Sequence, residues 1–231
     1  MIKGQAILKA EPKPIEIDFF KTALLVVDMQ NAFVRRGGYL DLLGFDISVT
    51  EKIITPCRKI VNAARKKGVK IIYLQMACSA DLLDIGNPNS PVSHKSRGLA
   101  FIEKHPEMKD RIYIHGTWGA NIIEELKQQP GDIIIRKQKY DGFVGTDLHT
   151  VLKSNNIKYL IFIGTATNIC VETTLRHAFS LNYFPILVSD AVSQLGPAIT
   201  QEATIHNVRS TFGWVTTSQE LLSMMKNIDD N

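Results

Sequence analysis

The sequence predicts an α/β fold: a three-layer α/β/α domain around a doubly wound, mostly parallel sheet of six strands. Five short runs are continuously apolar and rich in Val, Ile or Leu, as is typical of strands buried on both faces of a parallel sheet. Helical patterns separate these runs, and strands that alternate with helices indicate βαβ units with right-handed crossovers. The chain has 231 residues and 45% hydrophobic content, so we expect a single Rossmann-like domain over residues 1–231.

The expected strands follow one another after an irregular or edge-strand lead-in over residues 1–20. The five strong candidates are TALLVVD, VKIIYLQ, DIIIRK, YLIFIG and FPILVSD, at residues 22–28, 69–75, 132–137, 159–164 and 184–190. A weaker sixth candidate is GWVTT, at residues 213–217. Together they supply the six strands of the expected sheet.

Helices are expected between these strands. The stretch over residues 55–68 has Thr55 as a possible N-cap, Pro56 at the first helical position and Gly68 as a stop. Further helices are expected over residues 119–131, 146–156, 170–181, 200–213 and 217–226.

A long segment over residues 77–108 interrupts the alternation. It contains Gly86, Pro88, Pro91 and Pro106 with polar residues between them. A segment of this length inside a compact domain is usually an active-site cover or an oligomer arm. The alternative is a plain surface excursion.

Composition limits the function classes that fit the chain. The net charge is +4, but the lysines and arginines are scattered through the expected helices, which indicates solvated helix faces and no nucleic-acid partner. No apolar run reaches the length of a membrane span, so we expect none. Cys57, Cys78 and Cys170 are odd in number, far apart and free of metal-binding spacings. We therefore expect a protein of the reducing cytoplasm, without disulfides or metal.

Reactive residue types follow the expected strands, which is where ligands bind in an open parallel sheet. Asp28 ends the first strand, Gln75 the second and Lys137 the third, and the turn at 164–170 carries Cys170 after the fourth. Each residue alone has an ordinary structural role, such as a helix cap, a solvated strand end or core packing. An acid, an amine and a thiol at three strand ends together predict a catalytic site.

Cys170 stands near the start of an expected helix. A thiol in the first turn of a helix feels the partial positive charge of unpaired N–H groups, which favours the nucleophilic thiolate. Thr167 or Asn168 is expected as the N-cap. The small residues GTAT just upstream allow the main chain to approach a substrate, and N–H groups there can hold an oxyanion.

A cysteine nucleophile needs a base, and no histidine is well placed to be one. His177 follows Cys170 by about 10 Å along the same helix face, so we expect it at a helix surface or an interface. The other histidines do not follow expected strands. A carboxylate beside an amine serves instead: Lys137 would keep Asp28 ionised, and Asp28 would take the thiol proton.

Three motifs occur in a fixed order along the chain. An apolar strand ends in Asp-Met-Gln in ALLVVDMQNAF, a lysine precedes an aromatic residue in KQKYDGFVGTDL, and a Gly-x-x-Thr-x-x-Cys-Val turn is present in GTATNICVETTLRHAF. Together they resemble the isochorismatase-like cysteine hydrolase superfamily, over residues 17–225. The resemblance implies an isochorismatase-like fold with Asp28 as base, Lys137 as its partner and Cys170 as nucleophile.

The resemblance also implies details of the third motif. The family usually has a cis peptide there, which here falls between Thr165 and Ala166, and the backbone N–H groups of Ala166 and Cys170 would form the oxyanion hole. Members that keep the cysteine cleave amides, so Cys170 implies a hydrolase of C–N bonds in linear amides. The metal-site pattern of the nicotinamidase branch is not matched, so no metal and no other cofactor is expected. The family further implies a homo-oligomer, either a dimer or a tetramer.

Other stretches resemble one branch of the family. GGYLDLLGFDIS, GNPNSPVSHKS and FGWV are similar to the amidohydrolases that cleave ureidoacrylate in pyrimidine-ring degradation. This implies hydrolysis of a small ureido or carbamoyl compound through a thioester-type intermediate, with release of ammonia or carbamate. Met76, Ala77 and Cys78 replace a polar and aromatic stretch of that branch, which leaves the exact substrate open. The alternatives are a hydrolase of another carboxamide or carbamoyl compound, such as biuret, and a thiol redox or binding protein without hydrolytic activity.

Three residues are candidate substrate contacts. Tyr140 is placed to close over a flat ureido group, and Asn31 or Gln75 to orient its carbonyl. The alternatives are core or interface packing for Tyr140 and loop anchoring for the other two.

Overall fold

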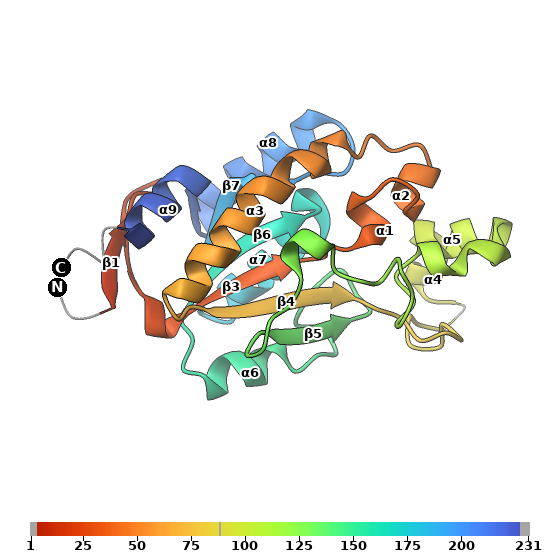
Figure 1. Ribbon diagram of the computed structural model, residues 1–231, viewed down its shortest axis with the longest axis horizontal. Coiled ribbons are helices and arrows are strands. Elements are labelled where there is room, and N and C mark those ends of the chain that lie inside the picture. Colours follow the sequence, from red (N-terminus) through yellow and green to blue (C-terminus); the bar gives the residue numbers. More distant parts are fainter. Residues whose placement is uncertain (1–3, 88, 227–231) are drawn as a thin grey trace.

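The computed structural model describes residues 4–87 and 89–226, which form three layers around a parallel sheet (Figure 1). The sheet has six strands in the order β5-β4-β3-β6-β7-β8. Their bounds are β3 (Thr22–Val27), β4 (Lys70–Met76), β5 (Ile133–Lys137), β6 (Tyr159–Thr165), β7 (Phe184–Ser193) and β8 (Trp214–Thr216). All neighbouring pairs are parallel. The predicted fold class and all six predicted strands are confirmed.

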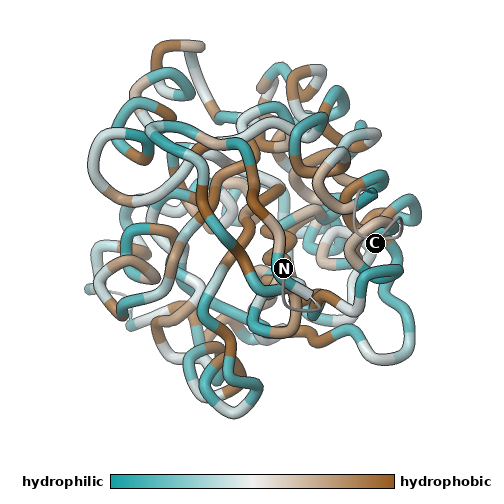
Figure 2. The backbone as a smooth tube through the Cα atoms, turned by 90° about the vertical axis from the view of Figure 1, so that its left-hand side faces the viewer, coloured by the Kyte–Doolittle hydropathy of each residue, from teal (hydrophilic) through white to brown (hydrophobic). Residues whose placement is uncertain are grey.

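Both faces of the sheet are apolar because successive strand residues point to opposite sides. In β3, Leu24 and Val26 enter one core cluster, whereas Ala23 and Leu25 enter the other. Hydrophobic stretches accordingly run through the middle of the molecule, with hydrophilic turns around them (Figure 2). This two-sided burial explains why the strands appear in the sequence as continuous apolar runs.

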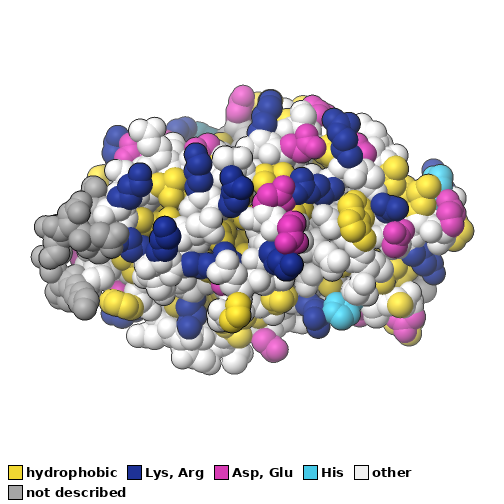
Figure 3. Space-filling view, in the orientation of Figure 1, with side chains coloured by type: hydrophobic (Ala, Val, Ile, Leu, Met, Phe, Trp, Pro, Cys, Tyr) yellow, Lys and Arg dark blue, Asp and Glu magenta, His cyan; other side chains and the backbone are white. Residues whose placement is uncertain are grey.

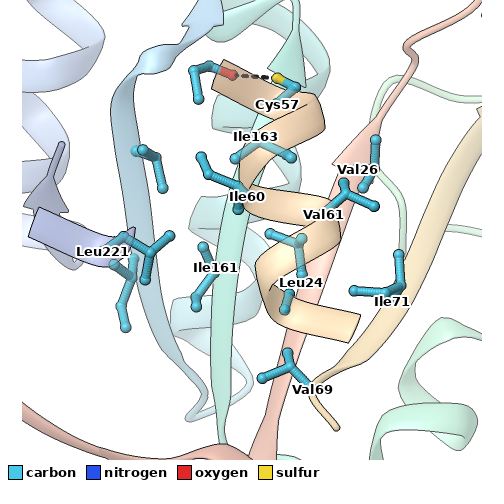
Figure 4. Packing of buried hydrophobic residues seen from close by; sticks show 14 of the residues in the cluster. Leu24, Val26, Cys57, Ile60, Val61, Val69, Ile71, Ile161, Ile163 and Leu221 are labelled. Carbon is cyan, nitrogen blue, oxygen red and sulfur yellow. Dashed lines mark hydrogen bonds between the residues drawn. The ribbon is translucent and has the colours of Figure 1, made fainter. Parts of the chain in front are cut away.

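Helices cover the two faces of the sheet. The first face packs against α3 (Ser48–Lys66) and α9 (Ser218–Lys226), and Figure 4 shows Ile60 and Val61 of α3 lying over β3 and β6. The second face packs against α6 (Leu148–Ser154), α7 (Glu172–Ser180) and α8 (Ala198–Asn207), the last continuing into the π-helical turn η5 (Val208–Phe212).

The prediction that a helix starts at Thr55 was wrong. α3 begins at Ser48, whose backbone N–H donates to Asp46 Oδ1 at 2.9 Å, and Pro56 lies inside the helix. Proline removes one intrahelical hydrogen bond and therefore prefers the first turn of a helix. Here the burial of the apolar face of α3 against the sheet stabilises the helix enough to outweigh this preference. The predicted stop is confirmed, since Gly68 follows the helix with a φ of 71°.

The prediction of a helix over residues 119–131 was also wrong. Only the short 3-10 turn η3 (Glu124–Leu126) forms there. The preceding residues pair instead with the segment after β3: Ile123 N–H donates to the Met29 carbonyl, and Asn31 N–H donates to the Asn121 carbonyl, each at 3.0 Å. Tertiary pairing therefore overrides the helical spacing of the apolar residues.

The segment over residues 77–108 lies beyond the carboxyl ends of the strands (Figure 1). Within it Pro88 is outside the described residues. The segment contributes α4 (Pro91–Lys95) and α5 (Arg97–Lys104), followed by the turn η2 (Pro106–Arg111). With α1 (Asn31–Val34) and α2 (Tyr39–Leu42), α5 forms a third apolar cluster. Because this cluster borders the strand ends, the prediction of an active-site cover is favoured over a plain surface excursion.

The lead-in forms a small two-stranded antiparallel sheet, β1 (Gln5–Leu8) with β2 (Ile15–Asp18), followed by the turn η1 (Phe19–Lys21); residues 1–3 lie outside the described part. Basic side chains are scattered over the face seen in Figure 3 and interleaved with acidic ones. Across residues 4–87 and 89–226, none of the helices combines the length and apolar character that crossing a membrane requires.

Candidate active site

Asp28 is the first residue after β3 and is buried. Its φ of 47° lies in the left-handed region, a strained conformation for an aspartate that is often found at functional sites. Its Oδ1 accepts the backbone N–H of Met76 at 3.0 Å, and its Oδ2 accepts Lys137 Nζ at 2.8 Å. The carboxylate is therefore fixed between the ends of β4 and β5.

Lys137 is the last residue of β5 and is fully buried. Its ammonium donates to Asp28 and, at 3.3 Å, to the carbonyl of Lys139. Burial alone would lower the pKa of this amine, but the neighbouring Asp28 and Cys170 outweigh burial and raise it. Lys137 therefore remains charged, and its ammonium fixes the position of the Asp28 side chain.

Cys170 lies in the π-helical turn η4 (Thr167–Val171), between β6 and α7. Its thiol is near enough to Asp28 and Lys137 for both charges to act on its pKa. The expectation of a stabilised thiolate was wrong: burial first, and then the charge of Asp28, raise the pKa of Cys170, although Lys137 opposes the rise. The resting thiol is thus protonated and adjacent to a carboxylate that can accept its proton.

The expected side-chain cap of this turn was wrong as well. The turn has no side-chain capping bond, because the Ala166 carbonyl accepts the N–H groups of Ile169 and Val171. The side chain of Asn168 instead pairs with the backbone of Leu195 at both its oxygen and its nitrogen. Asn168 therefore fixes the turn against the segment that follows β7.

The Thr165–Ala166 peptide is cis, which confirms the expectation from the third motif. Gly164 just before it has a φ of 114°, and a Cβ at this position would lie 2.1 Å from the Val27 carbonyl oxygen. Only glycine allows the ends of β3 and β6 to come this close. This contact brings the Cys170 turn against Asp28.

Asp28 and Cys170 line a single cavity, whose empty volume is about 530 Å³ when the space open to solvent is included. Ala166 lines it too, so both predicted oxyanion donors border the cavity. Most of the wall is apolar or aromatic, as in typical small-molecule sites. The remaining lining residues are Phe33, Tyr39, Leu40, Met76, Ser96, Arg97, Tyr113, Tyr140, Thr165, Ile169 and Leu195.

Of the three predicted substrate contacts, only Tyr140 lines this cavity. Asn31 and Gln75 line a separate open cleft, where their amides donate to the carbonyls of Trp118 and Ala120 at 2.9 Å and 2.8 Å. Both therefore anchor the loop that contains these carbonyls. Neither residue lines the cavity, so the structure gives their substrate contact no support. For Gln75 the reason is that side chains alternate along a strand, so Met76 reaches the cavity and Gln75 does not.

Several lining residues were missed, and they come from segments without strand-end placement. Ser96 and Arg97 belong to the 77–108 segment, and Tyr113 follows it. The Ser96 hydroxyl caps α5 by accepting the Leu99 N–H, and it lies 3.1 Å from the Tyr113 hydroxyl. In the sequence, the polar residues and prolines of the 77–108 segment indicated a cover over the active site. They did not indicate which side chains of the segment line the cavity.

The loop that carries Tyr140 is tied to the helix after Cys170. Thr174 Oγ1 accepts the Gly142 N–H at 2.9 Å and donates to the Cys170 carbonyl at 2.7 Å. His177 Nδ1 lies 2.6 Å from Asp141 Oδ2. His177 therefore packs on the helix surface, as expected, and contacts a loop that borders the cavity.

We searched the described residues for groups of three or more His, Cys, Asp or Glu side chains able to hold a metal ion, and found none.

The sequence is similar to proteins of known activity. Residues 22–220 match the family model described as the Isochorismatase domain. The chain is 44% identical to the ureidoacrylate amidohydrolase RutB of Agrobacterium fabrum, over 94% of this chain and 96% of that protein. It is 45% identical to the ureidoacrylate amidohydrolase RutB of Rhizobium rhizogenes, over 91% of this chain and 85% of that protein.

Solved structures share the fold. A cysteine hydrolase from Pseudomonas syringae pv. phaseolicola has a TM-score of 0.77 at 28% identity, covering 99% of this chain and 100% of that one. The N-carbamoylsarcosine amidase from Thermoplasma acidophilum has a TM-score of 0.63 at 27% identity, covering 86% of this chain and 96% of that one.

Proposed function

Because the chain belongs to the isochorismatase family, we propose that it is a cysteine-dependent amidohydrolase that cleaves a small ureido or carbamoyl compound such as ureidoacrylate. One observation carries the proposal: Cys170 borders a cavity with its thiol beside the buried Asp28–Lys137 pair. Nucleophile, base and orienting cation therefore meet at one point, as covalent hydrolysis requires.

In the proposed first step, Asp28 takes the proton of the Cys170 thiol, and the sulfur attacks the ureido carbonyl carbon. The carbonyl oxygen becomes an oxyanion, which the backbone N–H groups of Ala166 and Cys170 stabilise. One such donor typically contributes about 3 kcal/mol to the transition state. The proton held by Asp28 then passes to the departing nitrogen as the carbon–nitrogen bond breaks.

The second step releases the enzyme. Asp28, again ionised, takes a proton from water, whose oxygen attacks the thioester-type carbonyl and displaces the sulfur. Cys170 recovers its proton, and the products are carbamate or ammonia together with the remaining fragment. Lys137 stays charged throughout, so its ammonium keeps the Asp28 carboxylate oriented.

Two kinds of evidence support a ureido substrate. The relatives that match most of the chain are named for ureidoacrylate hydrolysis. The aromatic rings of Tyr39, Tyr113 and Tyr140 border the cavity, and flat rings of this kind suit a planar ureido group. N-carbamoylsarcosine amidase has the same fold, which keeps another N-carbamoyl compound as the second candidate.

A redox function of Cys170 has less support. The thiol is buried and its pKa is raised, whereas redox-sensing cysteines combine exposure with thiolate character.

We also propose that the chain is one domain, forms a homo-oligomer (a dimer or tetramer) and acts in the cytoplasm on a small molecule. Sedimentation analysis of the purified protein tests the oligomer: a monomer at micromolar concentration would contradict it.

The test of function is a hydrolysis assay against ureidoacrylate, N-carbamoyl compounds, biuret and simple carboxamides. We expect ammonia release from a ureido or N-carbamoyl compound, lost in Asp28→Asn and Cys170→Ala. Turnover that persists in Cys170→Ala, or reversible thiol oxidation with no hydrolysis of any compound, would contradict the proposal.

A further inference from the structure

Arg97, at the start of α5, is distinctive among the residues that line the cavity. Of the lining residues in the described part of the chain, only Asp28 and Arg97 carry a charge. The negative charge of Asp28 is neutralised by Lys137. The positive charge of Arg97 therefore determines the net charge of the side chains around the cavity. The cavity therefore favours a substrate with a negative group.

The guanidinium of Arg97 forms no ion pair with any residue that the structure describes. Its contact is the ring of Phe45, whose centroid lies 5.5 Å from its central carbon. Among residues 4–87 and 89–226, no carboxylate lies within ion-pair distance of Arg97. Five other arginines do pair with carboxylates: Arg35, Arg65, Arg111, Arg176 and Arg209. The donors of Arg97 thus remain available for a ligand in the cavity.

Arg97 lines the same cavity as Cys170 and Asp28, so one ligand with two ends can contact Arg97 and the reacting groups. Burial raises the pKa of Tyr39, and Arg97 works against this rise, so its charge acts on the tyrosine hydroxyl within the cavity. Tyr39, Tyr113 and Tyr140 border the same cavity as Arg97 and Cys170. A ureido acid has its reactive carbonyl at one end and a carboxylate at the other, joined by a short chain.

We propose that Arg97 is a specificity-determining residue that binds the carboxylate of an anionic ureido acid while its carbonyl reaches Cys170. The proposal rests on the proposed function and narrows its substrate class to ureido compounds that carry a carboxylate a few atoms from the reacting carbon. A guanidinium suits this role because its planar fork can bind both oxygens of a carboxylate.

The experiment compares two stable compounds that differ in charge at one end. These are 3-ureidopropanoate, which has the carboxylate, and 3-ureidopropanol, which has a neutral hydroxyl in its place. In Arg97→Gln we expect kcat/KM for the anion to fall about 10- to 100-fold, mostly through KM, since a hydrogen bond to a charged group is lost. For the neutral compound we expect a change of less than about 3-fold. Arg97→Lys keeps the charge without the fork, so its loss should be intermediate.

Arg58→Gln is the matched control, because it removes the same charge from an exposed site on α3 outside the cavity. It should leave both compounds unaffected. Equal losses for the two compounds in Arg97→Gln, or no loss for the anion, would overturn the role of Arg97.

A binding measurement separates this inference from the proposed function. Calorimetry of 3-ureidopropanoate with Cys170→Ala and with the Cys170→Ala, Arg97→Gln double variant needs no turnover. We expect at least about 10-fold weaker binding in the double variant. If the wild type hydrolyses no ureido compound, the proposed function fails while this difference still tests Arg97. Equal binding by both variants overturns the inference even in an active enzyme.

Discussion

Two of the hollows at the strand ends, the cavity that contains Cys170 and the cleft beside it, are built differently. The cavity that contains Cys170 has apolar and aromatic walls and borders a buried ion pair, Asp28 with Lys137. The neighbouring cleft is open and polar, and its residues Asn31 and Gln75 bond to loop carbonyls. A position at the end of a parallel strand is therefore insufficient to place a residue in the active site. Adjacent side chains at a strand end point to opposite sides of the sheet, so only some of them reach the cavity.

The difference also shows what burial does to chemistry. In the cavity, exclusion of water strengthens the interactions among thiol, carboxylate and ammonium. In the open cleft, charges such as the Arg35–Glu125 pair are partly exposed and screened. Four experiments sharpen or break this contrast, and they follow in order of the effect expected.

The largest effect should come from the cavity thiol. Cys170→Ala should lower kcat by about 10⁴-fold or more, because the covalent step is lost. Steady-state kinetics with the best ureido substrate measures the loss. The matched control is Cys57→Ala: Cys57 of α3 is also buried, but its thiol donates to the Ala191 carbonyl in the core (Figure 4). This control should keep its activity and lose about 1 kcal/mol of stability. Similar kinetics in the two variants would contradict the assignment.

The second effect concerns the ion pair. Lys137→Met leaves the Asp28 carboxylate buried without a partner, so the free energy of unfolding should fall by about 3–5 kcal/mol. Activity should fall by about 10³-fold, since the base is no longer oriented. Urea denaturation and kinetics measure the two losses.

A double variant separates the structural and chemical roles of this pair. Asp28→Asn combined with Lys137→Met removes both charges, so it should recover much of the stability but none of the activity. Recovery of both would mean that the pair is only structural.

The third experiment compares the two hollows directly. Tyr140 borders the cavity, so Tyr140→Ala should raise KM by about 10-fold through loss of its ring contact. Gln75 lies in the cleft and donates to the Ala120 carbonyl, so Gln75→Ala should leave KM unchanged and cost about 1 kcal/mol of stability. A larger rise in KM for Gln75→Ala than for Tyr140→Ala would reverse the assignment of the two hollows.

The smallest effect is the pH dependence of stability. The pKa values of Cys170 and Lys137 are both raised above their ordinary values of 9.0 and 10.5. Below pH 9 both groups hold their protons in the folded and unfolded chains, so their contribution to the free energy of unfolding is fully present. Above pH 9 the unfolded chain releases protons first, and stability should fall as pH rises. Thermal unfolding between pH 8 and 11 measures this fall, and Cys170→Ala should make it shallower. A stability that rises between pH 8 and 11 would contradict the raised pKa values of Cys170 and Lys137.

The sequence by itself determined the sheet and the three residues proposed for catalysis. Strands buried on both faces must be apolar throughout, so β3, β4, β6 and β7 were visible as continuous runs. The edge strand β5 was visible by its run of three isoleucines, although Ile134 is exposed. Asp28, Lys137 and Cys170 follow three of these strands, and their residue types indicated the chemistry. The motifs around them added the cis peptide at Thr165–Ala166.

Only the tertiary structure decided the rest. The start of α3 and the absence of a helix at residues 119–131 depend on contacts with segments far away in the sequence, as the Met29–Ile123 bond shows. The protonated state of Cys170 depends first on burial and then on the charge of Asp28, and neither is encoded in local residue types. Met76 lines the cavity and Gln75 does not, because neighbouring side chains of a strand point to opposite faces of the sheet. Arg97 entered the site only because the cover folds back over the strand ends, and such long-range packing leaves no periodic pattern in the sequence.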